Sequence, residues 1–580
     1  MLIKSPLFAI PALATWILAG SASAQTVPTT DTEEWRRRSQ QEELERQRLQ
    51  QAPNVRLQEE APAREDLEGL ALPVESPCFR IDRFLLEVPS QLPEFIRKRG
   101  ASSLPTDPFH FAQTYLDQYA GQCIGREGLN LIVRRLTARI LVKGYTTTRL
   151  GIPEQDLGSG QLKLTLMPGV IRAITFADAS LPGTWRTAFP ARPGDLLNVR
   201  DLEQGLEQMK RVPSQEVSIQ IVPGTRPGES DVVLTVQRGK PWRVIPSLED
   251  SGSEPTGRLQ AGLNLALDNP FGLSDLLSLS FNHDADGSPK EYGTRGDSVT
   301  YSLPWGYWTY AGTVSRYHYH QKVPGLSSTH EASGESRNLD LRIARLVQRN
   351  QTQKNTLQFR TGYRTSRSYL DDTEFDVQRR DNSYAELAWV HQHYLKQARF
   401  DATLARRQGV HWFGAQPDWP NATSDSPTFY YRMWTLDATL AVPFACGNQS
   451  FKYTATVRGQ YASDILYSTD FFSIGNRWTV RGFDGETTLA AEQGVFLRNE
   501  LEIALGRSGQ AFYLGLDGGR VQGPSAGDLP GNSLVGGALG FRGTPCKGLY
   551  YDVFIGGPLH QPRHFRNRWP VAGFSLSYQL

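Results

Sequence analysis

Residues 477–486, with the sequence RWTVRGFDGE, contain Arg481, a side chain that could form a specific ion pair. The guanidinium of Arg481 can form a bidentate, charge-assisted hydrogen bond with a carboxylate, a geometry that lysine cannot supply. Gly482 and Gly485 would permit the tight turn that presents this side chain. We therefore predict a loop that folds into a narrow, water-filled space, where Arg481 pairs with an acidic residue of the wall.

Asp517 is the acidic residue that we favour as the partner of Arg481. Within residues 512–519, FYLGLDGG, apolar residues alternate with small and polar ones. If the apolar residues face outward, Asp517 and its neighbouring glycines face inward, and the glycines leave room for an inserted loop. Glu500 and Glu502, in the preceding segment, are alternative partners, and the residues alone leave the choice open.

The chain lacks the common sequence motifs of enzymes. It contains no Gly-x-x-x-x-Gly-Lys-Ser/Thr phosphate loop, no Gly-x-Ser-x-Gly turn and no His-Glu-x-x-His pair. Lysine and arginine total 62 against 60 acidic residues, so the charge balance gives no reason to expect nucleic-acid binding. We therefore predict a protein that is not an enzyme and that binds no cofactor, no metal and no nucleic acid.

The second half of the chain shows the two-residue periodicity of strands with lipid on one side and water on the other. In residues 495–505, for example, apolar residues alternate with Arg498, Glu500 and Glu502. Such segments are about 9–11 residues long, the length at which a tilted strand crosses a bilayer. We count sixteen, an even number as expected for a bacterial barrel. They begin near residues 243, 257, 274, 297, 308, 337, 354, 383, 398, 429, 450, 493, 510, 533, 548 and 571.

The connections between these segments alternate between short and long, which predicts short periplasmic turns and long external loops. The longest connection, residues 463–492, contains the Arg481 stretch. The barrel would occupy residues 241–580 and end in a strand, residues 573–580, with one apolar face. We expect the barrel-assembly machinery to recognise this closing strand.

Three segments precede the compact part of the chain. Residues 1–24 combine an early lysine, an apolar run and a closing Ala-Ser-Ala, the pattern of a secretory signal peptide. Residues 25–51 contain a predicted helix without an apolar stripe, which is either a solvated segment or a helix stored inside a water-filled space. Residues 52–77 are proline-rich and predict a linker. No later stretch is apolar enough for a transmembrane helix, so any membrane would be crossed by strands.

Two small α+β domains are predicted between the linker and the barrel, at residues 78–167 and 168–240. In the first, residues 79–88 have the pattern of a strand and residues 129–142 that of a helix. In the second, residues 199–211 predict a helix between strands.

The four cysteines, Cys78, Cys123, Cys446 and Cys546, lie in a chain predicted to be exported, so disulfides are expected. Pairing Cys78 with Cys123 and Cys446 with Cys546 is the simplest of the three connectivities. The second pair would join two short turns that lie several strands apart, so we leave that bond open.

Several motifs occur in this order along the chain. They are Pro77-Cys-Phe79, residues 121–125 (GQCIG), 144–149 (GYTTTR), 153–157 (PEQDL) and 268–275 (DNPFGLSD), and the tetrapeptide Val480, Arg481, Gly482, Phe483. In these motifs the chain resembles the outer-membrane transporters of two-partner secretion, of the haemolysin/filamentous-haemagglutinin activator-secretion type, within the barrel-assembly-factor superfamily.

The resemblance implies a transmembrane β-barrel of 16 antiparallel strands, preceded by two periplasmic POTRA domains and an N-terminal plug helix. It also implies that the loop near 463–492 folds inward and that Arg481, at its tip, bonds to Asp517. The plug helix would occupy the pore at rest and leave during transport.

The function implied is a pore in the bacterial outer membrane that captures one large cognate exoprotein through its POTRA domains and secretes it unfolded, without ATP. The expected partners are the secretion domain of that exoprotein, outer-membrane lipid and the barrel-assembly machinery. The alternatives are an assembly factor for other barrels and a passive porin. Two periplasmic domains with a plug helix favour secretion over both.

Overall fold

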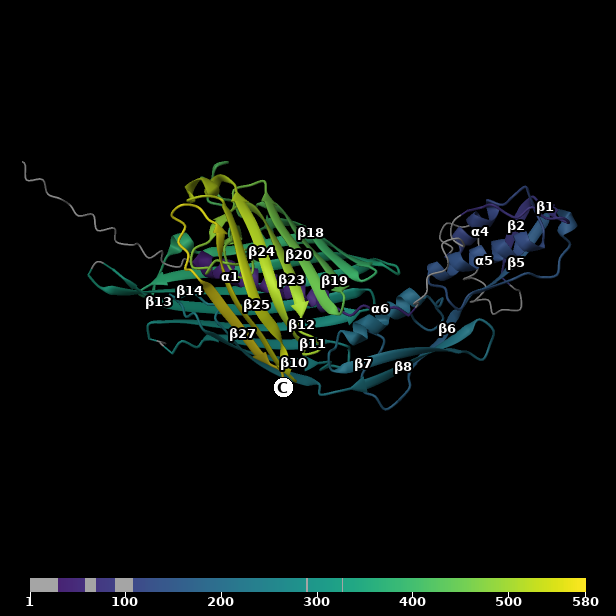
Figure 1. Cartoon of the computed structure of the whole chain (residues 1–580), viewed down its shortest axis with the longest axis horizontal. Helices are drawn as coiled ribbons and strands as arrows, with labels where there is room; N and C mark the ends of the chain where they lie inside the picture. The colour runs from purple at the N-terminus through teal and green to yellow at the C-terminus, as the bar shows by residue number, and fades with distance from the viewer. Residues whose placement is uncertain (1–29, 58–68, 89–107, 288–289, 326) are drawn as a thin grey trace, which may run out of the picture.

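The structure is a computed structural model that describes residues 30–57, 69–88, 108–287, 290–325 and 327–580. It consists of a large β-barrel with a helix inside it and two small α+β domains beside one end (Figure 1). The signal peptide expected at residues 1–24 lies outside the described residues. Within these ranges, no helix combines the length and the apolar character needed to span a membrane.

The barrel is one closed antiparallel sheet in which sixteen long strands follow each other in sequence order. The strands are β9 (Trp242–Glu249), β10 (Gln260–Asp268), β11 (Leu276–Asp284), β12 (Tyr292–Trp305), β13 (Trp308–Pro324), β14 (Thr329–Arg349), β15 (Gln353–Leu370), β17 (Arg380–Leu395), β18 (Ala398–Val410), β19 (Arg432–Cys446), β20 (Gln449–Ala462), β23 (Gln493–Ala504), β24 (Gln510–Gln522), β25 (Ser533–Cys546), β26 (Leu549–His560) and β27 (Val571–Tyr578). A two-residue strand, β16 (Thr373–Glu374), extends the hairpin between β15 and β17. The barrel closes between β27 and β9 through the pairs Ser575–Glu249, Leu576–Leu248 and Ser577–Ser247.

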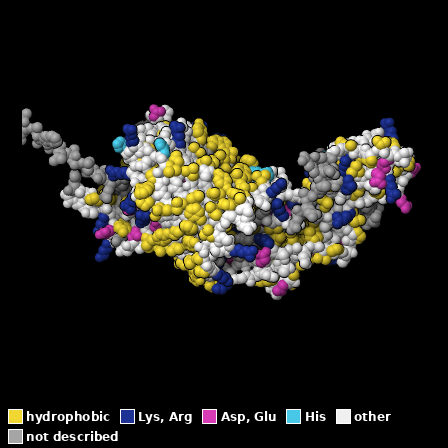
Figure 2. Space-filling model, viewed as in Figure 1, with side chains coloured by type: hydrophobic (Ala, Val, Ile, Leu, Met, Phe, Trp, Pro, Cys, Tyr) yellow, Lys and Arg dark blue, Asp and Glu magenta, His cyan; other side chains and the backbone are white. Residues whose placement is uncertain are grey.

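The alternation of residues along the strands separates an apolar outer face from a charged inner one. Leu497, Leu514 and Leu516 on β23 and β24 are exposed on the outside, and Figure 2 shows apolar side chains gathered over this face of the barrel. Asp517, next to Leu516, is buried on the inside. This is the arrangement that a strand between lipid and a polar lumen requires.

The first small domain follows the linker. Its elements are β1 (Phe79–Ile81), β2 (Arg83–Glu87), α4 (His110–Asp117), β3 (Gln122–Ile124), α5 (Arg126–Val142), β4 (Arg149–Gly151), η1 (Leu157–Ser159) and β5 (Gln161–Met167). The prediction of a single strand over residues 79–88 is wrong. At Asp82 the chain leaves its partner β3 and joins β5, and the N–H of Asp82 donates to the carbonyl of Gly160 at 2.8 Å. One predicted strand therefore serves two sheets.

The second small domain adjoins the barrel through its helix. It contains β6 (Val170–Phe176), α6 (Val199–Lys210), β7 (Gln215–Pro223) and β8 (Glu229–Arg238), with sheet order β6-β8-β7. Asn198 caps α6 by accepting a hydrogen bond from the N–H of Arg200. The apolar side of α6 covers the sheet, and Leu202 and Leu206 are buried there. Gln204 and Gln208 of α6 contact the barrel at the turn between β12 and β13, which lies beside this helix (Figure 1).

Helix α1 (Thr30–Gln51) lies inside the barrel and is drawn in purple in Figure 1. The loop between β20 and β23 also folds inward and contains η3 (Ser468–Asp470), β21 (Phe472–Ile474) and β22 (Leu489–Ala491). Short 3-10 turns, η2 (Asp376–Gln378) and η4 (Pro524–Asp528), occupy other loops. Helix and loop together fill space that the sheet encloses.

Candidate functional site

The inward loop packs against the barrel wall through its own small apolar core. This core joins the inward loop to strands β23, β24 and β25 and to the connection between β26 and β27. Its members are Phe472, Ile474, Val480, Phe483, Leu489, Ala491, Phe496, Val521, Leu534 and Phe565. The side chains of Val480 and Phe483 are 0% and 2% exposed. The loop is thus held in place by burial of apolar surface, as an element of a protein core would be.

Glycines permit the close approach between the loop and the wall. Gly482 has φ +93°, and a Cβ there would lie 2.3 Å from the carbonyl oxygen of Gly557. On the wall, a Cβ at Gly536 would lie 2.0 Å from the carbonyl oxygen of Arg481, and one at Gly515 would lie 2.5 Å from its guanidinium carbon. Larger residues at these positions would push the arginine out of its place.

Arg481 meets Asp517 in a bidentate ion pair on the inner wall. Its Nε donates to Asp517 Oδ2 at 2.6 Å, and its Nη2 donates to Oδ1 at 2.8 Å. The backbone N–H of Arg481 donates to the same carboxylate at 3.0 Å. The side chains of Arg481 and Asp517 are 5% and 0% exposed, so water does not compete for these bonds.

Glu500 also bonds to Arg481, whereas Glu502 does not. The Nη1 of Arg481 donates to Glu500 Oε2, and the Nη2 also donates to the carbonyl of Asn499 at 3.0 Å. Glu502 lies instead 3.6 Å from Arg542. Asp517 and Glu500 are therefore partners at one site rather than alternatives, since a guanidinium has enough donors for both.

The helix α1 is held in the lumen mainly by arginines of the wall. Four of its glutamates face four arginines on the three strands β15, β20 and β23: the pairs are Glu34–Arg364 at 3.3 Å, Glu43–Arg498 at 3.4 Å, Glu45–Arg360 at 3.5 Å and Glu42–Arg458. One pair is reversed, with Arg46 of the helix 3.1 Å from Asp437 of β19. A helix that is polar nearly all round is stable here because its environment is polar on every side.

The helix also contacts the inward loop directly. Trp35 Nε1 donates to the carbonyl of Ser468 at 2.7 Å, and its ring stacks on Phe471. Arg36 donates to the carbonyl of Gly485 at 3.2 Å. Movement of α1 would therefore break contacts that the loop makes at its base and near its tip.

Arg498 connects the helix, the loop and the wall. Its Nη1 lies 3.4 Å from Glu43 of α1 and donates to the carbonyl of Trp478 in the loop at 3.0 Å. Its Nε lies 4.0 Å from Asp517. The alternation along residues 495–505 predicts that Arg498 faces inward, but it predicts no role for this residue. The alternation of residues along β23 indicates the direction in which the Arg498 side chain points. It does not indicate which residues this side chain contacts.

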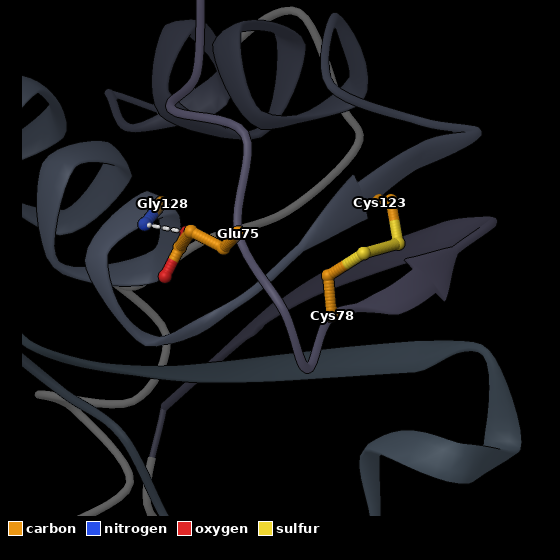
Figure 3. Close-up of a disulfide and its surroundings, with 4 residues drawn as sticks. All are labelled: Glu75, Cys78, Cys123 and Gly128. Carbon is orange, nitrogen blue, oxygen red and sulfur yellow. Dashed lines mark hydrogen bonds between the residues drawn. A yellow bond between two sulfur atoms is a disulfide. The ribbon is translucent and has the colours of Figure 1, made fainter.

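The structure joins Cys78 to Cys123 in a disulfide, with the two Cα atoms 5.4 Å apart (Figure 3). Nearby, the carboxylate of Glu75 accepts hydrogen bonds from the N–H groups of Glu127 and Gly128 at 2.7 and 2.6 Å. It thereby binds the start of α5, where an anion is favoured by the helix dipole. The two contacts fasten the end of the linker to the first domain.

The pairing considered for Cys446 and Cys546 is not formed, and both cysteines are free and exposed. They end β19 and β25, between which β20, β23 and β24 intervene. At about 4.8 Å per strand, the two turns lie far beyond the Cα separation of roughly 7 Å that a disulfide permits.

Comparison with known proteins covers almost the whole chain. The model of the family described as haemolysin secretion/activation protein ShlB/FhaC/HecB matches residues 228–543. A POTRA domain model matches residues 170–223, and a ShlB-type POTRA model matches residues 95–169.

Individual relatives agree with the family models. The outer membrane transporter CdiB-2 of Burkholderia pseudomallei is 44% identical over 98% of both chains. The hemolysin transporter protein ShlB of Serratia marcescens is 30% identical over 69% of this chain and 71% of its own. The solved structure of CdiB from Acinetobacter baumannii has a TM-score of 0.80 at 27% identity and covers 95% of this chain and 98% of that one.

Proposed function

This chain belongs to the ShlB/FhaC/HecB family of haemolysin secretion and activation proteins, and from that premise we propose how its parts secrete a protein. The family consists of outer-membrane transporters of two-partner secretion, so the chain is a translocation pore for a cognate exoprotein, with its barrel in the outer membrane and its POTRA domains in the periplasm. The proposal concerns the path of that exoprotein and the parts that must move.

The observation that carries the proposal is the occupied lumen. Helix α1 and the inward loop lie where an exported chain would pass, and α1 is held mainly by ion pairs and hydrogen bonds, with one aromatic contact from Trp35. Polar contacts exchange readily with water, so their net contribution is small once water reaches them. The helix therefore serves as a plug that leaves during transport.

The inward loop serves as a latch on the wall. Its apolar core and the pair of Arg481 with Asp517 hold it more firmly than α1 is held. Because α1 contacts this loop through Trp35 and Arg36, loss of the plug weakens the loop from one side only. The plug leaves first in this scheme.

The periplasmic domains capture the exoprotein by adding it as a strand. β7 is an edge strand of the second domain, paired on one side with β8, and Ile221 and Val222 on it are exposed. Such an edge binds an extended chain through main-chain hydrogen bonds and so suits an unfolded client. Folding of the client outside drives export without ATP.

Insertion of the transporter itself depends on outer-membrane lipid and on the barrel-assembly machinery. The apolar outer face in Figure 2 supports the contact with lipid. The closing strand β27, which presents Leu576 and Tyr578 outward, supports recognition by the assembly machinery.

Mass spectrometry of a parent strain and a strain lacking this protein tests the proposal. We expect one large exoprotein to disappear from the culture supernatant while the outer membrane keeps its composition. Loss of many barrels from the outer membrane would instead indicate an assembly factor. An unchanged supernatant and membrane would contradict secretion and favour a passive porin.

A further inference from the structure

The linker that follows α1 is bound by its backbone at the periplasmic end of the barrel. The N–H of Val55 donates to Glu207 Oε1 at 2.7 Å, and the N–H of Leu57 donates to Glu203 Oε1 at 2.9 Å. The carbonyl of Val55 accepts a hydrogen bond from Arg349 Nη2 at 2.6 Å. All three bonds use main-chain atoms of the linker.

The three side chains that bind residues 55–57, those of Glu203, Glu207 and Arg349, form a buried charge cluster with Lys354. Both nitrogens at the end of the Arg349 side chain donate to Glu207 at 2.8 Å, and its Nε donates to Glu203 at 3.2 Å. Lys354 donates to Glu207 at 2.7 Å. The side chains of Glu203, Arg349 and Lys354 are 1%, 4% and 7% exposed. The site is therefore built and largely sealed from water.

The charge cluster lies across the joint between two parts of the molecule. Glu203 and Glu207 come from α6 of the second POTRA domain, whereas Arg349 ends β14 and Lys354 is near the start of β15. An extended chain bound here touches both the capture domain and the mouth of the barrel. A client on its way into the lumen must pass this place.

The side chains of the linker alternate as in a strand. Val55 and Leu57 are half-buried and pack on the core of the second POTRA domain, while Arg56 between them is exposed and lies over the ring of Tyr394 at 5.1 Å. Recognition thus depends on an extended backbone with apolar residues at two alternate positions. Many unfolded segments meet this requirement, because it involves no particular polar side chain.

Withdrawal of the plug must empty the site. α1 has 22 residues and is therefore about 33 Å long. Only the few residues between Gln51 and Val55 join it to the site, and a chain of that length spans at most about 15 Å. The helix cannot leave the lumen while Val55 stays bound. Glu203 and Glu207 then each lose one backbone donor, and they keep hydrogen bonds from the side chains of Arg200, Arg349 and Lys354.

We propose that the charge cluster is a docking site for an extended apolar-x-apolar segment of the exported chain, occupied at rest by residues 55–57. The exoprotein takes over the site when the linker departs with α1. Exchange of one backbone for another restores the two lost backbone hydrogen bonds and places the client at the mouth of the barrel. This proposal rests on the function proposed above.

A peptide that copies the linker tests whether the site binds a backbone. The probe is a fluorescent peptide of residues 53–58, PNVRLQ, added to the full-length transporter in detergent. The transporter carries V55P and L57P, which remove both N–H donors of the resident linker. We expect saturable binding, measured by anisotropy, and a loss of about a hundredfold in affinity when the peptide is N-methylated at Val55 and Leu57, since each charge-assisted bond contributes on the order of tenfold.

The matched control is the same peptide N-methylated only at Arg56, between the two donors, which we expect to keep its affinity. Heat-modifiable migration in gels verifies that the variant transporter is folded. Absence of saturable binding to a folded variant, or equal affinity of the doubly methylated peptide, would overturn the docking site.

Photo-crosslinking in cells tests whether the exoprotein occupies the docking site during export. This experiment does not need the proline variant. Tyr394 is replaced by p-benzoylphenylalanine, which keeps an aromatic ring beside the linker. We expect an adduct with the exoprotein while it is being exported. Adducts only within the transporter, while exoprotein accumulates in the supernatant, would overturn the exchange. If no exoprotein depends on the transporter, the proposed function fails instead, and peptide binding still decides whether the site exists.

Discussion

At the scale of single residues, Arg481 is bonded through both its side chain and its backbone. Its guanidinium and backbone N–H bond to Asp517, and the same guanidinium bonds to Glu500 and to the carbonyl of Asn499. The wall glycines Gly515 and Gly536 make room for this placement, because a Cβ at either position would clash with Arg481. An arginine is needed because a lysine ammonium, as a single point charge, cannot form the planar pair of bonds.

Replacing Arg481 should impair secretion without removing the barrel from the membrane. R481A leaves Asp517 buried without its partner, at a cost of about 3–5 kcal/mol to the docked loop. We expect secretion to fall strongly in R481A and less in R481K, which keeps the charge. Immunoblots of the exoprotein in the supernatant measure secretion. Heat-modifiable migration of the transporter in gels measures whether the barrel is folded in the membrane.

A double-mutant cycle distinguishes the ion pair from a general effect of substitution. R481A combined with D517N should be no worse than R481A alone, because both changes remove one interaction. E502Q is the matched control, since Glu502 faces the same lumen without touching Arg481. Normal secretion by R481A, or additive defects in the double mutant, would contradict the latch.

At the scale of elements, α1 depends on its surroundings. As an isolated helix it has no apolar face to bury, but in the lumen its glutamates face an arginine wall. Each such pair, partly reached by water, contributes about 0.2–1 kcal/mol. Many weak contacts together therefore hold the plug helix in the lumen. Changing the charges that form these contacts should change how firmly the helix is held.

Removing helix charges should open the pore more often. With E34Q, E42Q and E43Q combined, three pairs with wall arginines are lost, and we expect open events to increase about tenfold if the loss totals near 1.4 kcal/mol. Single-channel conductance in planar bilayers measures this frequency. R48Q is the control, because it changes a charge on an exposed part of α1. An unchanged open frequency in the triple variant would show that these pairs do not hold the plug.

The disulfide stabilises the first POTRA domain. Cys78 and Cys123 are separated by 45 residues, and closing a loop of that size contributes about 4 kcal/mol in the chain-entropy model. C78S combined with C123S should make the first domain markedly more sensitive to protease in the full-length transporter. C446S combined with C546S, which alters the two free cysteines, should leave the cleavage pattern unchanged. Equal sensitivity of both variants would contradict this role.

At the scale of the whole molecule, the second POTRA domain is fastened to the barrel by α6. Gln204 and Gln208 both donate to the carbonyl of Gly306 at 3.3 Å, and Glu207 binds Arg349. These contacts hold the capture domain beside the barrel mouth (Figure 1). The joint is polar, so acid should affect it.

Docking of the second POTRA domain should weaken in acid. Burial alone would raise the pKa of Glu207, but hydrogen bonds from Arg349 and the charge of Lys354 lower it below its usual value of 4.5. A group with a lowered pKa stabilises the docked state above pH 4.5, and this contribution is lost as the pH falls through the lowered pKa. The rate of amide hydrogen exchange in α6, measured at a series of pH values, reports how this contribution changes.

Asp201, on the same helix, has the opposite effect on the pH dependence of docking. Burial raises its pKa although Tyr307 donates a hydrogen bond to it, so its protonation in acid favours docking. Comparison with E207Q isolates the contribution of Glu207, and E216Q, at an exposed position, is the control. If α6 in the unaltered protein shows the same acid response as in E207Q, Glu207 does not fasten the joint.

The sequence by itself determined the barrel. Alternation with a period of two and turn length are local properties, so the number of strands and most of their starting points follow from them. β14 begins at Thr329 rather than near residue 337, because its extension rests on hydrogen bonds to β13 beyond the lipid-facing span. The same local pattern placed Asp517 on the inner face.

Only the tertiary structure decided which residues meet across the lumen. The pairing of Arg481 with two carboxylates, the arginine wall around α1 and the binding of residues 55–57 by three charged residues join positions far apart in the chain. Periodicity states which way a side chain points, but not what lies opposite it. Contacts across an enclosed space depend on barrel closure and on the placement of the helix and loop, which no local pattern contains.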